Sequence, residues 1–234
     1  MNRQAWIGDN ESMTQLARCL AISMTALAAV VAPGGLDAQV PMTTSYAGLG
    51  PAYTWLDLER PSPTGKVRAG GLSITGEAGL VISGFFADVR LATGSLDYED
   101  ADSSVTLVEG ELMLGYRPLR WLALKLGPHV RKVETPSQSD DWVFWEGRLW
   151  LGATLLDRIA YSYVEGWVIF SASPPENTSF DNGFGFEGGL FVKTTTLPVW
   201  LKAGYRIDRA TFNSLGSADT VQQLLLLLGI DFNL

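Results

Sequence analysis

Two-residue alternation of apolar and polar side chains runs through most of this chain, and it is clearest from Val105 to Val133. Successive side chains of a β-strand point to opposite faces, so this stretch predicts strands with one wholly uncharged face. The run Arg-Pro-Leu-Arg at 117–120 interrupts the alternation and predicts the turn of a hairpin. On the charged face, Glu109 and Glu111 would then lie roughly opposite residues 125–129.

The same pattern recurs from residue 46 to the end and predicts about ten antiparallel strands, with eight as the alternative. Strands are expected near 47–58, 72–82, 85–91, 108–116, 122–131, 143–153, 161–170, 184–193, 199–208 and 223–234. The connections alternate between tight ones near 83, 118, 156 and 196 and longer ones near 62, 99, 138, 177 and 214. No stretch has the 3.6-residue period of a helical second domain. A single all-β domain over residues 39–234 is therefore expected.

Composition excludes several classes of protein. A formal net charge of −8 leaves no basic excess to neutralise phosphates, so no nucleic-acid partner is expected. An apolar fraction of 47% argues against a disordered chain. The single cysteine, Cys19, rules out an intramolecular disulfide, and the single histidine, His129, rules out a multi-histidine metal site. We therefore expect no cofactor and no metal.

Residues 1–38 have the features of a cleavable export signal. Residues 19–31 form an apolar core, Pro-Gly-Gly at 33–35 breaks it, and Leu-Asp-Ala at 36–38 offers a small-residue cleavage point. This core is shorter than the ~20 residues that a membrane-spanning helix needs. Met13 is a candidate initiator because the residues before it have no signal character. The alternative is a buried N-terminal helix.

The alternation fits either a membrane barrel with its apolar face toward lipid or a soluble β-sandwich with that face in its core. Expected strands of about ten or more residues match a tilted membrane span better than globular strands, which cluster near 5–6. The polar face also offers matched charges: Glu187 near Arg206, Arg148 near Glu165, and Lys202 near Asp231. Aromatic residues lie on the apolar face, many near strand ends, as interfacial girdle residues would: Tyr53, Trp55, Tyr116, Trp145, Phe170, Phe184, Tyr205 and Phe232. These features favour the membrane barrel.

In this alternation, residues 46–234 resemble the small bacterial outer-membrane β-barrel proteins related to the OmpA transmembrane domain and to OmpW. The resemblance is one of pattern, and the final residue is Leu234, where such proteins typically end in an aromatic residue. It implies a closed, porin-like, up-and-down antiparallel barrel in the outer membrane of a bacterium with a Gram-negative type of envelope. It also implies the outer-membrane lipid and the barrel-assembly machinery as partners, and a small solute or ion as a possible cargo.

The charged face would line the lumen of this barrel. Ion pairs and inward tryptophans would fill most of a lumen of about ten strands, which predicts a structural or narrow-pore role and no catalytic site. The residues expected to form this polar network are Glu109, Glu111, Lys125, His129, Arg131, Glu146, Arg148, Glu165, Glu187, Lys202, Arg206 and Asp231.

Two other functions remain open from the sequence. An outer-membrane enzyme that modifies lipid or cleaves protein would need a nucleophile or water with a base, and His129 with Glu109 is the dyad available. No serine lies beside it on the inward face. Glu109 and Glu111 are poor candidates for paired acid–base catalysts, because Lys125 and Arg131 would neutralise them. The other possibility is a secreted β-sandwich that binds a ligand through exposed tryptophans.

Overall fold

The computed structural model describes residues 44–59, 66–100, 102–135, 139–156, 159–173, 179–212 and 217–233. The expected signal segment 1–38 and the candidate initiator Met13 lie outside the described residues.

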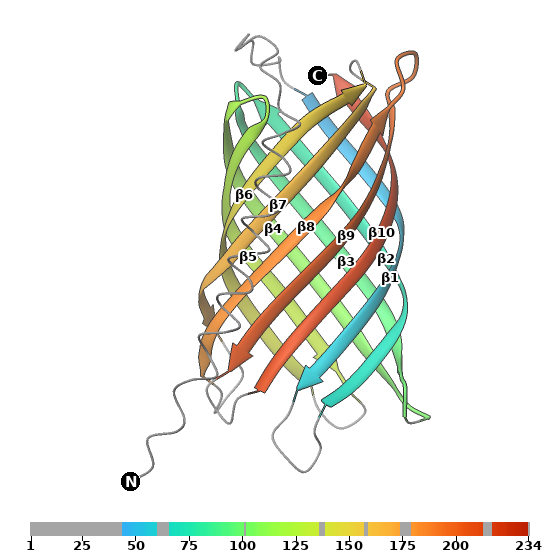
Figure 1. Ribbon diagram of the computed structural model, residues 1–234, viewed down its shortest axis with the longest axis vertical. Helices are drawn as coiled ribbons and strands as arrows, with labels where there is room; N and C mark the ends of the chain where they lie inside the picture. The colour runs from blue at the N-terminus through green and yellow to red at the C-terminus, as the bar shows by residue number, and fades with distance from the viewer. Residues whose placement is uncertain are drawn as a thin grey trace. The chain divides into compact units, whose positions relative to one another are not determined.

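The described chain forms ten antiparallel strands that close into one barrel, in which each strand pairs with its sequence neighbours and β1 pairs with β10 (Figure 1). The strands are β1 (Thr44–Glu59), β2 (Lys66–Ile82), β3 (Phe85–Tyr98), β4 (Ser104–Leu119), β5 (Leu122–Glu134), β6 (Ser139–Leu156), β7 (Ala160–Ser173), β8 (Phe180–Lys193), β9 (Val199–Phe212) and β10 (Ser217–Asn233). The predicted up-and-down barrel of about ten strands is confirmed. Among the described residues, no helix has the length and apolar character to cross a membrane.

The connections divide the barrel into a short-turn end and a long-loop end. The start of β1 and the end of β10 pair with each other at the short-turn end, as expected for an even number of strands. One connection there is the two-residue Ser83-Gly84 turn, where both residues have positive φ (50° and 87°). Two such residues match the twist of a hairpin, and glycine adopts this conformation at little cost.

One predicted turn is displaced. The break expected at 117–120 is strand as far as Leu119, and the turn is Arg120-Trp121. Pro118 lies where the pairing of β4 with β5 shifts register, between Tyr116 and Leu119. A proline has no N–H to donate to the ladder, so strands tolerate it at such an irregularity. The proline therefore marks a bulge just before the turn.

The apolar face of every strand points outward. On β10, Leu224, Leu226, Leu228 and Ile230 are 42–60% exposed, whereas Arg206 on the inward face of β9 is 1% exposed. A sandwich would bury the leucines between two sheets and place the arginine in water. The barrel is closed, with its apolar side chains outside and its charged side chains inside, and this excludes the sandwich alternative.

Aromatic side chains lie on the outer face toward both ends of the barrel. At the short-turn end, the rings of Phe85 and Tyr116 are 4.9 Å apart, and toward the long-loop end those of Tyr53 and Trp55 are 4.6 Å apart. Two such bands flanking an apolar surface are typical of a barrel that spans a bilayer.

Close contact between β4 and β5 depends on Gly127. A Cβ atom on Gly127 would lie 1.9 Å from the carbonyl oxygen of Leu112, a backbone atom that a rotamer change cannot move away. By contrast, a Cβ on Gly147 of β6 would meet nothing within 4 Å. Only glycine therefore fits at position 127, where the backbones of β4 and β5 approach each other closely.

Candidate functional site

The lumen contains three regions along the barrel axis, each made of inward side chains. A cavity lies at the short-turn end, ion pairs occupy the middle, and apolar side chains fill the region toward the long-loop end. The alternation of each strand determines which residues face inward. The position of a residue along its strand then determines which region it joins.

The centre of the ion-paired region surrounds His129, whose side chain is fully buried. Its Nδ1 lies 2.8 Å from Oε1 of Glu146, and its Nε2 lies 3.3 Å from Oε1 of Glu109. Arg131 donates from Nε to the same Glu109 oxygen at 2.9 Å, and Gln223 donates to the other oxygen at 2.9 Å. Several donors thus share one buried carboxylate, which lowers the cost of keeping it in the lumen.

Two further arginines connect the carboxylates of different strands. Arg148 Nη1 lies 2.8 Å from Glu111 and 3.3 Å from Glu165, and Arg206 pairs with the other oxygen of Glu111. Both guanidinium groups also lie over the ring of Trp167, at 4.7 and 4.5 Å from its centroid. Two like charges thus contact one aromatic ring, and both pair with the carboxylate of Glu111.

Lysines make the ion pairs nearer the short-turn end. Lys202 Nζ lies 2.7 Å from Glu77 and 3.1 Å from Glu187. Lys125 Nζ lies 2.7 Å from Glu165 and 3.3 Å from Asp88. Each lysine therefore bridges two carboxylates.

The structure brings the predicted polar residues together, with one exception. Asp231 lies apart from the rest and pairs with Lys193 at the short-turn end. The predicted Lys202–Asp231 pair is wrong, because Lys202 is opposite Leu227 in the register, four residues along β10 from Asp231. Glu77 on β2, which pairs with Lys202, lies three strands away around the barrel.

The expected neutralisation of the paired glutamates is correct in part. Arg131 neutralises Glu109 as predicted, but Lys125 pairs with other acids, and the partners of Glu111 are Arg148 and Arg206. The predicted His129–Glu109 contact is present. Complete burial of the His129 ring, however, leaves it no access to a substrate.

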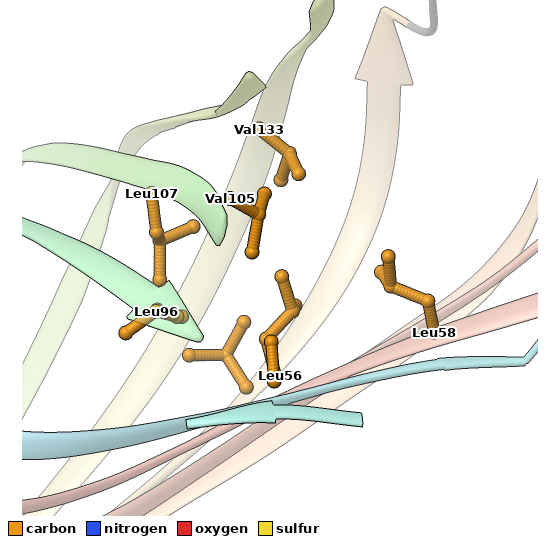
Figure 2. Close-up of a cluster of buried hydrophobic side chains, with 8 residues drawn as sticks. Leu56, Leu58, Leu96, Val105, Leu107 and Val133 are labelled. Atoms are coloured by element: carbon orange, nitrogen blue, oxygen red, sulfur yellow. The ribbon is translucent and has the colours of Figure 1, made fainter. Parts of the chain in front are cut away.

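Sequence reasoning missed that the inward face becomes apolar toward the long-loop end. We call this set the apolar layer, and Figure 2 shows its side chains inside the barrel. It contains Leu56, Leu58, Ala69, Leu96, Val105, Leu107, Val133 and Val221. Beside it, the ring of Trp142 stacks on Phe212 at 4.2 Å. The missed signal was a change of parity: next to the longer loops, apolar residues such as Leu107 and Val133 share the parity of the charged inward residues, whereas their outward neighbours, such as Thr106 and Lys132, are polar.

His129, Glu146 and Asp208 offer ligand atoms within 4.8 Å of one another, a spacing that could suit a metal ion. Cationic side chains already occupy the surroundings. Arg131 Nη2 lies 3.2 Å from Asp208, and Arg148 donates from Nε to Glu146 at 2.9 Å. These guanidinium groups supply the positive charge that a metal would bring, so the cluster is better explained as part of the ion-pair network.

Asp57 lies on β1 beyond Tyr53 and Trp55, the aromatic band toward the long-loop end. It accepts a hydrogen bond of 2.6 Å from Nε of Arg68. This bond holds the pKa of Asp57 below its usual value, and Lys66, 3.3 Å away, acts in the same direction. The pair joins β1 to β2 where the two strands enter the loop between them.

The short-turn cavity has a volume of about 490 Å³. Ion-paired residues such as Glu111 and Arg148 form its floor, and aromatic residues including Phe86 and Trp150 line its wall. Arg117 lies over both rings, with Cζ 5.8 Å from the centroid of Phe86 and 5.2 Å from that of Trp150.

No family model matches the chain, and no curated protein sequence matches it either. Among solved structures it is similar to Neisserial surface protein A (NspA), at 16% identity and a TM-score of 0.40, over 80% of this chain and 97% of that one. It is also similar to the translocator domain of the autotransporter NalP from Neisseria meningitidis, at 14% identity and a TM-score of 0.42, over 94% and 98%. A Pseudomonas aeruginosa FadL homologue is similar at 8% identity and a TM-score of 0.37, over 83% of this chain and 91% of that one. No functional conclusion follows from likenesses this distant.

Proposed function

We propose that this protein is an integral outer-membrane β-barrel whose closed lumen gives it a structural role. Support for the membrane location comes from the outward apolar face, the two aromatic bands and the closure of the sheet, which leaves no edge strand exposed to lipid. On this proposal, residues 1–38 direct export and are removed, lipid covers the outer face, and the barrel-assembly machinery inserts the chain.

The observation that carries the structural role is the burial of side chains across the middle of the lumen. His129 and Glu146 are completely buried, Arg131 and Arg206 are 1% exposed, and Phe144 closes against His129 with ring centroids 5.6 Å apart. The apolar layer adds a second barrier on the long-loop side. Opening a path for an ion would require separating buried ion pairs, which is costly because it leaves uncompensated charges.

The same burial argues against an enzyme. A general base must come within hydrogen-bonding reach of its substrate, and the ring of His129 is enclosed by Glu109, Glu146 and Phe144. We therefore propose no catalytic residue and no resident cofactor.

Two measurements test membrane integration. The mature protein, fractionated from a Gram-negative host, should sediment with the outer membrane and should migrate differently on a gel before and after boiling. Mass determination of its N-terminus should show cleavage after Ala38. A protein that stays soluble without detergent and shows no change of mobility would contradict the membrane proposal.

Planar-bilayer recording tests the closed lumen. The refolded barrel should give no single-channel steps under conditions in which a wide porin conducts. A variant in which Leu56, Leu96 and Phe144 are all changed to alanine should still give no steps, because the buried ion pairs remain across the lumen. Steps in this variant would place the barrier in the apolar layer and the adjoining ring. Steady conductance of the unmodified barrel would assign it the narrow-pore role in place of the structural one.

A further inference from the structure

The short-turn cavity carries a positive lining charge within an acidic protein. Seven basic and six acidic side chains line it, a net charge of +1, whereas the whole chain has a formal net charge of −8. Its volume of about 490 Å³ falls in the range of small-molecule sites, 300–1,000 Å³. Both properties suit a small ligand with a negative charge.

Most cations of the cavity already have carboxylate partners. Arg90 pairs with Glu187 at 2.8 Å, and the lysines of the cavity and Arg148 pair with acids as described above. Arg117 differs: within the part of the chain that the structure describes, no carboxylate lies at ion-pairing distance from its guanidinium group. Its Nε is buried and has no hydrogen-bond partner among the described residues. This cation is therefore available to an anion from outside the chain.

The position of Arg117 is well defined. Its backbone N–H donates to the carbonyl oxygen of Gly84 at 2.8 Å, which fixes the end of β4 against the β2–β3 turn. Its guanidinium group lies over the rings of Phe86 and Trp150. A guanidinium packed through its face keeps the N–H groups along its edge available, and that edge matches the two oxygens of a carboxylate or phosphate.

The neighbouring aromatic residues suit the rest of such a ligand. Tyr161, Tyr163 and Phe191 also line the cavity, so an apolar group attached to the anion would contact rings and not water. We propose that the short-turn cavity binds a small organic anion, a carboxylate or phosphate joined to an apolar group, with Arg117 contacting the anion. This inference goes beyond the structural role and does not depend on whether the lumen conducts.

Ligand-observed NMR on the refolded, detergent-solubilised barrel tests this site, with empty micelles as the blank. Benzoate and phenyl phosphate are the anionic probes, and benzamide and benzylamine are their neutral and cationic counterparts. The structure predicts saturable binding of at least one anion and weaker binding of both counterparts. Equal binding of benzoate, phenyl phosphate and benzamide would overturn the proposal, and so would a preference for benzylamine.

Substitutions assign the contact to Arg117. Arg117→Gln should weaken binding of the anion about ten- to hundredfold, the effect of losing a charged hydrogen-bonding partner. Arg117→Lys should retain part of the affinity, since it keeps the charge but loses the planar fork. Arg209→Gln is the matched control, because this half-exposed arginine pairs with Glu59 and lies outside the cavity. Each variant must still show the mobility change on boiling, and unchanged affinity in a folded Arg117→Gln barrel would refute the assignment.

Discussion

Removing one buried cation tests whether the ion pairs in the lumen stabilise the barrel by neutralising each other's charges. Arg131 on β5 is 1% exposed, donates to Glu109 from Nε at 2.9 Å, and places Nη2 2.8 Å from Glu109 and 3.2 Å from Asp208. The substitution Arg131→Met keeps a side chain of similar length and removes the charge. Glu109 then stays in the lumen without its main partner.

The expected loss of stability follows from these contacts. Breaking a buried pair by removing one partner costs about 3–5 kcal/mol. Glu109 keeps the hydrogen bond from Gln223 and the contact with His129, so we expect about 3 kcal/mol, the lower end of that range. Adding Glu109→Gln should recover most of the loss, because the second substitution removes the stranded charge.

The free energy of unfolding can be measured in detergent micelles by guanidinium titration, with tryptophan fluorescence and gel mobility as separate probes and linear extrapolation to zero denaturant. Lys132→Met is the matched control. Lys132 follows Arg131 on the same strand, is 40% exposed on its side chain and pairs with Glu134 in a solvated setting, so little change is expected. The reasoning fails if Arg131→Met costs no more than Lys132→Met, or if the double variant is no more stable than the single one.

Three further predictions concern the strands, the outer face and the long-loop end. Gly127→Ala should prevent or severely slow refolding, because its Cβ would overlap the Leu112 carbonyl, whereas Gly147→Ala should refold normally, as the change of gel mobility can show. Leu226→Arg should lower the free energy of unfolding by about 2–4 kcal/mol in a bilayer, the cost of a charge near the midplane on the lipid face, and a cost near zero would mean that lipid does not cover β10. The lowered pKa of Asp57 implies a contribution to stability that is present above the ordinary pKa of an aspartate and is lost as the pH falls through the lowered value. Asp57→Asn should therefore remove part of the acid sensitivity of unfolding, and identical pH profiles for the two proteins would contradict this.

The sequence determined the strands and the face that each residue joins. Alternation of period two is a property of local backbone geometry. The alternate residues Leu224, Leu226, Leu228, Ile230 and Phe232, and the same parity in the other strands, could therefore be assigned to one face without knowing any neighbouring strand. The same pattern, with the alternating lengths of the connections, was enough to predict an antiparallel barrel of about ten strands. It did not locate the turn after Leu119, because a bulge absorbs Pro118 within the strand.

Only the tertiary structure decided which inward residues meet. Closing the sheet brings side chains of distant strands to one point in the lumen, such as Lys202 and Glu77, and the stagger of the strands sets these encounters. Period-two reasoning carries no information about that stagger, and it therefore paired Lys202 with Asp231. The apolar layer and the place of Arg117 in the short-turn cavity depend on depth along the barrel axis, which is fixed when all ten strands close together.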